Sequence, residues 1–160
     1  TQAALTGHLV FSTLHTNDSV SAVTRLANLG LEEYLIAATL RGVLAQRLVR
    51  KVCPHCKEPW EPDARIREAM TREGCQWDTL YRGAGCGRCR STGFAGRIGV
   101  FELLVPDGTV LDAIASGTNL QELRTLVEGR GFRSLRHDGL EKVCHGLTTP
   151  EEVLSVTSLS

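Results

Sequence analysis

The chain has 160 residues, of which 42% are hydrophobic, so it can bury a core and general disorder is excluded. Its formal net charge is zero, which excludes a uniformly basic protein built to bind a polyanion, although local basic patches remain. Because no signal peptide opens the sequence and no run of about 18 apolar residues is present, we expect a cytosolic protein whose thiols stay reduced.

The first element along the chain is a predicted strand. Residues 8–14 form a short apolar run that is typical of a strand buried on both faces of a parallel sheet. His8 and His15 stand at the two ends of this run. Since the sequence has no initiator Met and reaches the strand almost at once, we expect a piece of a longer polypeptide that begins inside a domain.

Two helices are predicted next. Asn17 or Asp18 can cap the first, over residues 19–28, because a short polar side chain accepts a hydrogen bond from the free N–H groups of the first turn. The second is predicted from about Glu32 to Arg50, where apolar residues recur at helical spacing. This stripe consists of Leu35, Ile36, Leu40, Val43, Leu44 and Leu48.

The rest of the chain predicts short elements separated by glycines. A helix is expected over residues 63–73, and residues 93–106 read as a turn followed by a strand that Pro106 ends. The remainder is predicted to be helical. Capping-box patterns at residues 119–122 and 149–152 mark the beginnings of two of these helices.

The strongest chemical signal is a pair of C-x2-C motifs. They consist of Cys53 and Cys56, and of Cys86 and Cys89. Four thiolates are the donors that tetrahedral Zn²⁺ prefers, at about 2.3 Å each. Because a closed set of four leaves no position for water, we predict a structural zinc rather than a catalytic one. An iron–sulfur centre, a redox dithiol and chance are the alternatives.

Basic residues surround the cysteine motifs in the sequence. They are Arg50, Lys51, Lys57, Arg88, Arg90 and Arg97. A zinc ribbon with such residues can bind nucleic acid, but the chain is neutral overall and only 5% aromatic, so platforms for base stacking are scarce. We therefore expect a solvated face and no nucleic-acid partner.

Of the two histidines, His15 is the better candidate for a catalytic site. In a parallel α/β sheet, ligands gather outside the carboxyl ends of the strands, where His15 would stand. His8 lies roughly 23 Å away along an extended strand, so the two cannot touch one phosphate unless the strand bends sharply. A purely structural role is the alternative for both.

Several segments resemble the bacterial secretion ATPases that drive type II secretion and type IV pilus assembly. The segment TGHLVFSTLHTND resembles the His box of that family, and the resemblance continues through VLAQRLVRKVCPHC, GFAGRIGVFELL and HGLTTPEEVLSVT. It covers essentially the whole chain. The pilus-retraction branch of the family lacks the four cysteines, so the secretion and pilus-assembly branches fit better, and type II secretion is preferred.

The resemblance implies an α/β fold: the C-terminal portion of a RecA-like P-loop ATPase core with an inserted four-cysteine zinc lobe and a C-terminal helical region. Residues 1–52 would belong to the ATPase core, 53–97 to the zinc-binding subdomain, and 98–160 to a strand with a helical subdomain. The intact protein would be a homo-hexamer using ATP and Mg²⁺. It would be cytoplasmic, peripheral on the inner membrane, and would push on an inner-membrane platform protein that assembles pseudopilin.

The same resemblance suggests site residues. His15 is expected at the γ-phosphate, and His8, which also falls on the His box, is taken as a weaker catalytic residue near a subunit boundary. Gln46 and Arg47 match the family pattern without an assignable role. Since the sequence has no G-x-x-x-x-G-K-[ST], the phosphate-binding loop and the acidic boxes are expected outside this chain, which alone should be inactive. Two alternatives remain: a type IV pilus assembly ATPase, and a non-catalytic zinc module that docks on a membrane partner or nucleic acid.

Overall fold

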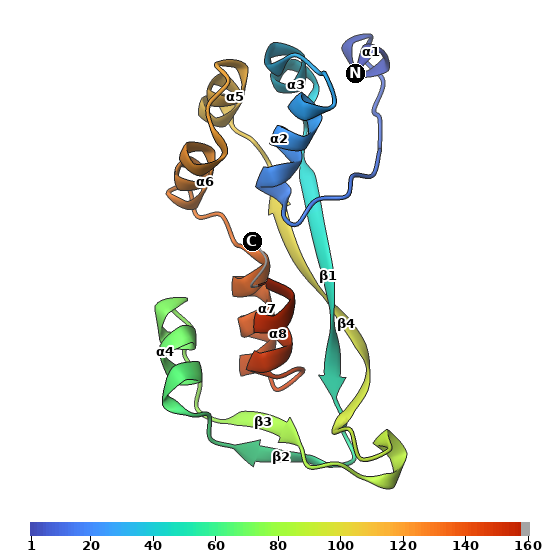
Figure 1. Ribbon diagram of the computed structural model, residues 1–160, viewed down its shortest axis with the longest axis vertical. Coiled ribbons are helices and arrows are strands. Elements are labelled where there is room, and N and C mark those ends of the chain that lie inside the picture. Colours follow the sequence, from blue (N-terminus) through green and yellow to red (C-terminus); the bar gives the residue numbers. More distant parts are fainter. Residues whose placement is uncertain (158–160) are drawn as a thin grey trace. The chain divides into compact units, whose positions relative to one another are not determined.

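The computed structural model describes residues 1–157, which form short helices and two-stranded sheets (Figure 1). The helices are α1 (Gln2–Leu5), α2 (Ser19–Asn28), α3 (Glu33–Thr39), α4 (Ala64–Arg72), α5 (Gly108–Ala115), α6 (Leu120–Glu128), α7 (Leu135–Cys144) and α8 (Pro150–Thr157), with a 3₁₀ turn η1 (Gly87–Cys89). The strands are β1 (Val43–Val52), β2 (Lys57–Trp60), β3 (Leu80–Gly83) and β4 (Phe94–Leu104). Strand β1 pairs with β4, and β2 pairs with β3 in antiparallel register. None of the helices in this described part is long and apolar enough to span a bilayer.

The chain divides into two compact units, each built from two separate stretches. Unit 1 comprises residues 1–45 and 102–133, and unit 2 comprises residues 46–101 and the chain from Ser134 on. Strands β1 and β4 therefore each run from one unit into the other. The three-part division into 1–52, 53–97 and 98–160 stays a prediction, and its last three residues lie outside the described ones.

Unit 1 is built mainly from helices. Helix α3 packs on α5, and α2 packs on α6. Its core gathers Val20, Val23, Ile36, Leu104, Val110, Ile114, Leu123 and Val127. The predicted helix over residues 19–28 is confirmed, and Asp18 is its cap, because its carboxylate accepts a hydrogen bond from the N–H of Ser21 at 2.7 Å.

Unit 2 has its own core, which helices α7 and α8 help to form. This core consists of Ile66, Met70, Leu80, Leu140, Val143 and Val153, supplied by α4, β3, α7 and α8. Helices α7 and α8 approach so closely that a Cβ at Gly139 would lie 2.5 Å from a methyl carbon of Val153. The glycine in α7 is thus explained by packing.

Several predicted elements are confirmed. Helix α4 lies within the predicted range, and β4 ends just before Pro106. Helix α6 begins after Asn119, whose side chain accepts a hydrogen bond from the N–H of Glu122 at 3.0 Å, and α8 begins at Pro150. These boundaries follow from local capping chemistry.

The predicted helix over residues 32–50 is wrong beyond Thr39. Helix α3 ends there, and residues 43–52 form strand β1. Leu44 and Leu48 looked like an i, i+4 helical pair, but in the strand they share one exposed face while Val43, Ala45 and Val49 turn to the other. Because i and i+4 lie on one side of both a helix and a strand, the apolar spacing could not separate the two.

Residues 8–15 form no strand, contrary to the prediction. They are irregular and largely exposed, with Phe11 87% exposed. A strand buried on both faces needs neighbouring strands and covering helices, and within residues 1–157 no strand pairs with this segment. Residues 1–157 therefore do not bury the apolar side chains of this segment.

Candidate functional site

The four cysteines of the C-x2-C motifs come together in unit 2. Their Sγ atoms all lie within 4.8 Å of one another, with separations of 4.0 Å for Cys53–Cys86, 3.8 Å for Cys56–Cys89 and 3.7 Å for Cys86–Cys89. Four zinc–sulfur bonds of about 2.3 Å in a tetrahedron separate the sulfurs by about 3.8 Å. Soft donors at these distances fit a zinc ion. Within residues 1–157 this is the one cluster of its kind.

Tight turns position the sulfurs. Cys53 follows β1, Cys56 precedes β2, Cys86 immediately precedes the 3₁₀ turn η1, and Cys89 is the last residue of that turn. Backbone N–H groups point at two of the sulfurs: that of Gly85 donates to Cys56 at 3.3 Å, and those of Cys86 and Gly93 donate to Cys89 at 3.1 and 3.3 Å. Such donors stabilise the thiolate form that binds metal.

The local environment acts differently on two of the thiols. Burial would raise the pKa of Cys89, but the N–H groups of Cys86 and Gly93, together with hydrogen bonds to the thiols of Cys86 and Cys56, outweigh it and lower that pKa to about 6. Burial is the main reason that the pKa of Cys56 rises to about 12. A divalent cation among the sulfurs would supply the positive charge that allows all four to ionise together.

Two glycines close the base of this lobe. A Cβ at Gly83 would lie 2.0 Å from the carbonyl oxygen of Gly93, and one at Gly93 would lie 2.4 Å from that of Gly83. Gly93 also has a φ of +76°, in the left-handed region that favours glycine. Its carbonyl accepts a hydrogen bond from the N–H of Cys53 at 2.9 Å, so the two ends of the lobe meet here.

The remaining cysteines and His55 are not metal ligands in this geometry. Cys75 and Cys144 both pack against the core of unit 2. Burial raises the pKa of Cys75 to about 11 and also raises that of Cys144, so both stay protonated at neutral pH. His55 is exposed, with Nε2 3.2 Å from a guanidinium nitrogen of Arg88.

The two histidines of the His box both lie in unit 1. The Nδ1 atom of His8 lies 3.2 Å from the carbonyl oxygen of Ala3 and 3.1 Å from the hydroxyl of Thr6. The side chain of His15 is exposed. Gln46, on β1, lies against Gly99 on β4. The catalytic roles of His8 and His15 remain predictions.

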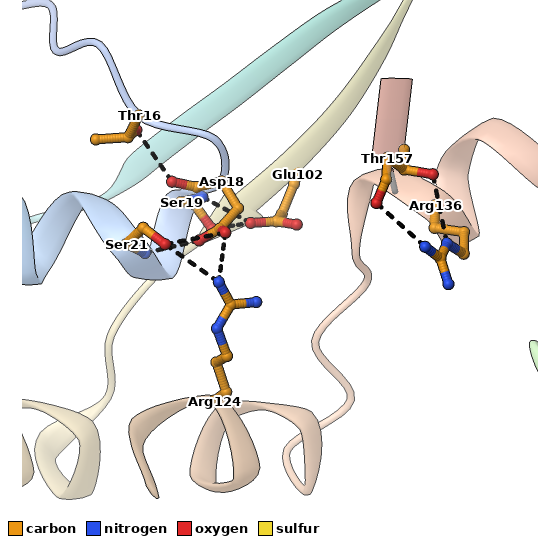
Figure 2. Close-up of polar contacts among 8 residues, drawn as sticks. All are labelled: Thr16, Asp18, Ser19, Ser21, Glu102, Arg124, Arg136 and Thr157. Atoms are coloured by element: carbon orange, nitrogen blue, oxygen red, sulfur yellow. Dashed lines mark hydrogen bonds and ion pairs between the residues drawn. The ribbon is translucent and has the colours of Figure 1, made fainter. Parts of the chain in front are cut away.

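A partly buried ion pair begins three residues after His15, and the sequence did not predict it (Figure 2). The Oδ2 atom of Asp18 accepts a hydrogen bond from a guanidinium nitrogen of Arg124 at 2.5 Å and one from the hydroxyl of Ser21 at 3.0 Å. Arg124 lies on α6, which packs on α2. The sequence identified Asp18 as a cap, but nothing in it marked the distant arginine.

A second carboxylate holds the same helix end. Glu102, on β4, is 5% exposed, and its Oε1 accepts hydrogen bonds from the N–H and the hydroxyl of Ser19 at 2.7 and 2.5 Å. Elements from two other parts of unit 1 thus fix the start of α2. The available signal was a carboxylate inside the apolar run VFELL, since such a charge is rarely buried without partners.

Comparison with known proteins identifies the family of this chain. The model of the type II/IV secretion system protein family matches residues 1–155. The chain belongs to this family. Among the relatives of this secretion family member, the type IV pilus assembly ATPase PilB of Thermus thermophilus is 48% identical over 98% of the chain. The type II secretion system ATPase E of Vibrio cholerae is 47% identical over 99% of it.

The chain spans only part of these relatives, 18% of the first and 31% of the second. A crystal structure of the pilus retraction motor PilT with bound ADP matches 97% of the chain and 34% of that motor, with a TM-score of 0.62 and 21% identity. The shared fold confirms the predicted α/β class, and the four cysteines form one cluster within this fold. The relatives include both secretion and pilus-assembly ATPases, so the comparisons establish the family but do not distinguish type II secretion from pilus assembly.

Proposed function

We propose that this chain supplies the C-terminal part of an ATP-hydrolysing motor subunit that powers type II secretion. The observation that carries the proposal is the 47% identity to the Vibrio cholerae type II secretion ATPase over nearly the whole chain. In this proposal the subunit forms a hexamer on the cytoplasmic side of the inner membrane and pushes on a platform protein. A type IV pilus assembly ATPase is the second candidate, favoured by the similar identity to PilB.

Complementation tests the proposal and separates the two candidates. The gene for the whole protein is introduced into a host that lacks its type II secretion ATPase and into one that lacks its pilus assembly ATPase. Restored secretion without restored pili supports the first candidate, and the reverse supports the second. A purified whole protein that does not hydrolyse ATP would contradict both.

We assign the nucleotide chemistry to a site that His15 helps to complete. ATP and Mg²⁺ would be held by a phosphate-binding loop and acidic residues outside these 160 residues, so the chain alone is inactive. His15 would donate a hydrogen bond to the charge that develops on the γ-phosphate, and loss of one such donor typically lowers turnover about 10²- to 10³-fold. In the whole protein, His15→Ala should therefore lower kcat strongly, with little change in nucleotide affinity.

The matched control is His8→Ala. Because the His8 ring makes its hydrogen bonds to nearby Ala3 and Thr6, removing this side chain should lower turnover less than His15→Ala does. Steady-state kinetics and thermal unfolding of both variants distinguish a catalytic role of His15 from a packing role. Reduced stability with near-normal turnover for His15→Ala would indicate a packing role instead.

We also propose one structural Zn²⁺ per chain, bound by Cys53, Cys56, Cys86 and Cys89. The support is the donor set, its separations and the N–H groups aimed at the sulfurs. Metal analysis of purified protein should give one zinc per chain, and Cys86→Ser should lower that content. Cys75→Ser is the control, since that thiol lies outside the cluster and should leave the zinc content unchanged.

A further inference from the structure

Arg124 connects helix α6 to the beginning of helix α2. Its guanidinium donates to the Oδ2 of Asp18 at 2.5 Å and to the hydroxyl of Ser21 at 3.1 Å (Figure 2). The side chain of Asp18 is 4% exposed and that of Arg124 is 26% exposed. Because little water reaches this ion pair, solvent screening weakens the attraction between its two charges only slightly.

The link extends to the residue that follows His15. The hydroxyl of Thr16 donates to the carbonyl oxygen of Asp18 at 3.1 Å, which closes the turn between them. Asp18 thus uses its Oδ1 to cap α2, its Oδ2 to bind Arg124, and its backbone to hold Thr16. The peptide that leaves His15 enters directly into this fixed turn.

A comparison within unit 1 shows that capping alone does not require a buried pair. Asp107 caps α5 by accepting from the N–H of Val110 at 2.9 Å, and it also binds an arginine, Arg130, at 2.8 Å. There the side chains are 54% and 37% exposed. The two pairs have the same chemistry, but the Asp18 pair is the less exposed of the two, and it lies next to a residue of the His box.

We infer that Arg124 is a positioning residue that acts on His15 through Asp18 and Thr16. It orients the His15 backbone for phosphoryl transfer and takes no part in binding the nucleotide. The inference rests on the proposed function. Since a misplacement of about 1 Å can cost about 10²-fold in rate, an intact link should affect kcat far more than KM.

The test uses the whole protein and compares Arg124→Gln with Arg130→Gln. We expect Arg124→Gln to lower kcat at least about tenfold with KM for ATP within about twofold, and the control to change neither. Arg124→Lys keeps a charged donor and should recover most of the lost turnover. If Arg124→Gln raises KM at unchanged kcat, or if its kcat equals that of the control, the inference is wrong.

A double-mutant cycle with His15→Ala tests the route. If Arg124 acts through His15, Arg124→Gln should cause no further loss of kcat once His15 is alanine, whereas independent effects would multiply and contradict the inference. His15→Ala alone reports on the proposed function separately, because normal turnover in that variant would contradict the catalytic role of His15 while Arg124 is intact. If Arg124→Gln fails to fold, the cycle is run with Asp18→Asn/Arg124→Gln, which removes both charges of the pair together.

Discussion

Gly83 and Gly93 bring two backbones into direct contact at the base of the cysteine lobe. Each glycine leaves no room for a Cβ against the carbonyl of the other, and Gly93 also donates its N–H to the sulfur of Cys89. One residue therefore combines a positive φ, a steric limit and a hydrogen bond to a proposed metal ligand. Gly96 has a similar φ of +77°, but a Cβ there would meet no other atom within 4 Å, so the two glycines separate these effects.

We predict that Gly93→Ala destabilises the protein far more than Gly96→Ala. The strain of a positive φ should cost about 1–2 kcal/mol in both variants. Gly93→Ala adds a clash with backbone, which should bring the loss of unfolding free energy to roughly 3 kcal/mol or more, together with a lower metal content. Denaturant unfolding and metal analysis measure the two quantities. Equal costs for the two variants would contradict the close contact of Gly83 with Gly93.

At the scale of elements, an ion pair fastens strand β1 to helix α8 within unit 2. The N–H and the guanidinium of Arg50 both donate to the carboxylate of Glu152. Arg50 also stacks on the ring of Phe94, 4.2 Å from its centroid, and its carbonyl accepts a hydrogen bond from the hydroxyl of Thr148 at 2.7 Å. Both hydrogen bonds that Arg50 donates end on Glu152 in the first turn of α8, and Thr148 lies two residues before that helix.

The hydrogen bond from the Arg50 guanidinium is the main cause that lowers the pKa of Glu152, against the opposing effect of burial. A lowered pKa in the folded protein means that the stabilisation is complete above the unfolded value of about 4.3 and is lost as pH falls through the folded value. Glu152→Gln should therefore reduce stability at pH 7 by about 1 kcal/mol, and this difference should shrink below pH 4. Thermal unfolding from pH 7 to pH 3 measures it. Glu151→Gln, an exposed neighbour on the same helix, is the control, and an equal effect there would contradict the assignment.

Local signals in the sequence predicted some elements well and others poorly. Capping residues such as Asn119 act on N–H groups a few positions away, so helix beginnings could be read directly. The clustering of the four cysteines could be predicted for a similar reason, because each CxxC turn brings its two thiols together locally, whereas the bound metal stays a prediction. The prediction for residues 43–52 was wrong because the spacing of their leucines fits both a helix and a strand. The Asp18–Arg124 pair could not be predicted because it joins residues more than 100 positions apart.

At the scale of the whole molecule, a metal should stabilise the two units unequally. The four sulfurs connect the end of β1, the start of β2 and the turn η1, all of which belong to unit 2. Structural zinc sites in small domains contribute on the order of 10 kcal/mol of binding free energy to folding. Chelation should therefore remove much of the hydrogen-exchange protection of residues 53–60 and 80–93, while α2 and α6 in unit 1 keep theirs.

Hydrogen exchange followed by mass spectrometry, with and without a strong chelator, measures this difference. Readdition of zinc should restore the protection, and readdition of Mg²⁺ should not, because Mg²⁺ prefers oxygen donors. Protection that is lost to the same extent in both units would show that the chain unfolds as one cooperative body instead.

The hydrogen bond from the N–H of Cys53 to the carbonyl of Gly93 joins the two ends of residues 54–92, so this segment can be gained or lost as a unit among members of the family. Strands β1 and β4 run in opposite directions on either side of this bond, so residues 54–92 leave and rejoin the pair at one point, as an insertion into a hairpin would (Figure 1). Yet this segment supplies Ile66, Met70 and Leu80 to the core that contains Leu140, Val143 and Val153. A lineage that lost the insertion would expose those last three side chains to water. Across the family, the presence of both cysteine pairs should therefore covary with apolar residues at these three positions, and members without the pairs should carry polar residues there.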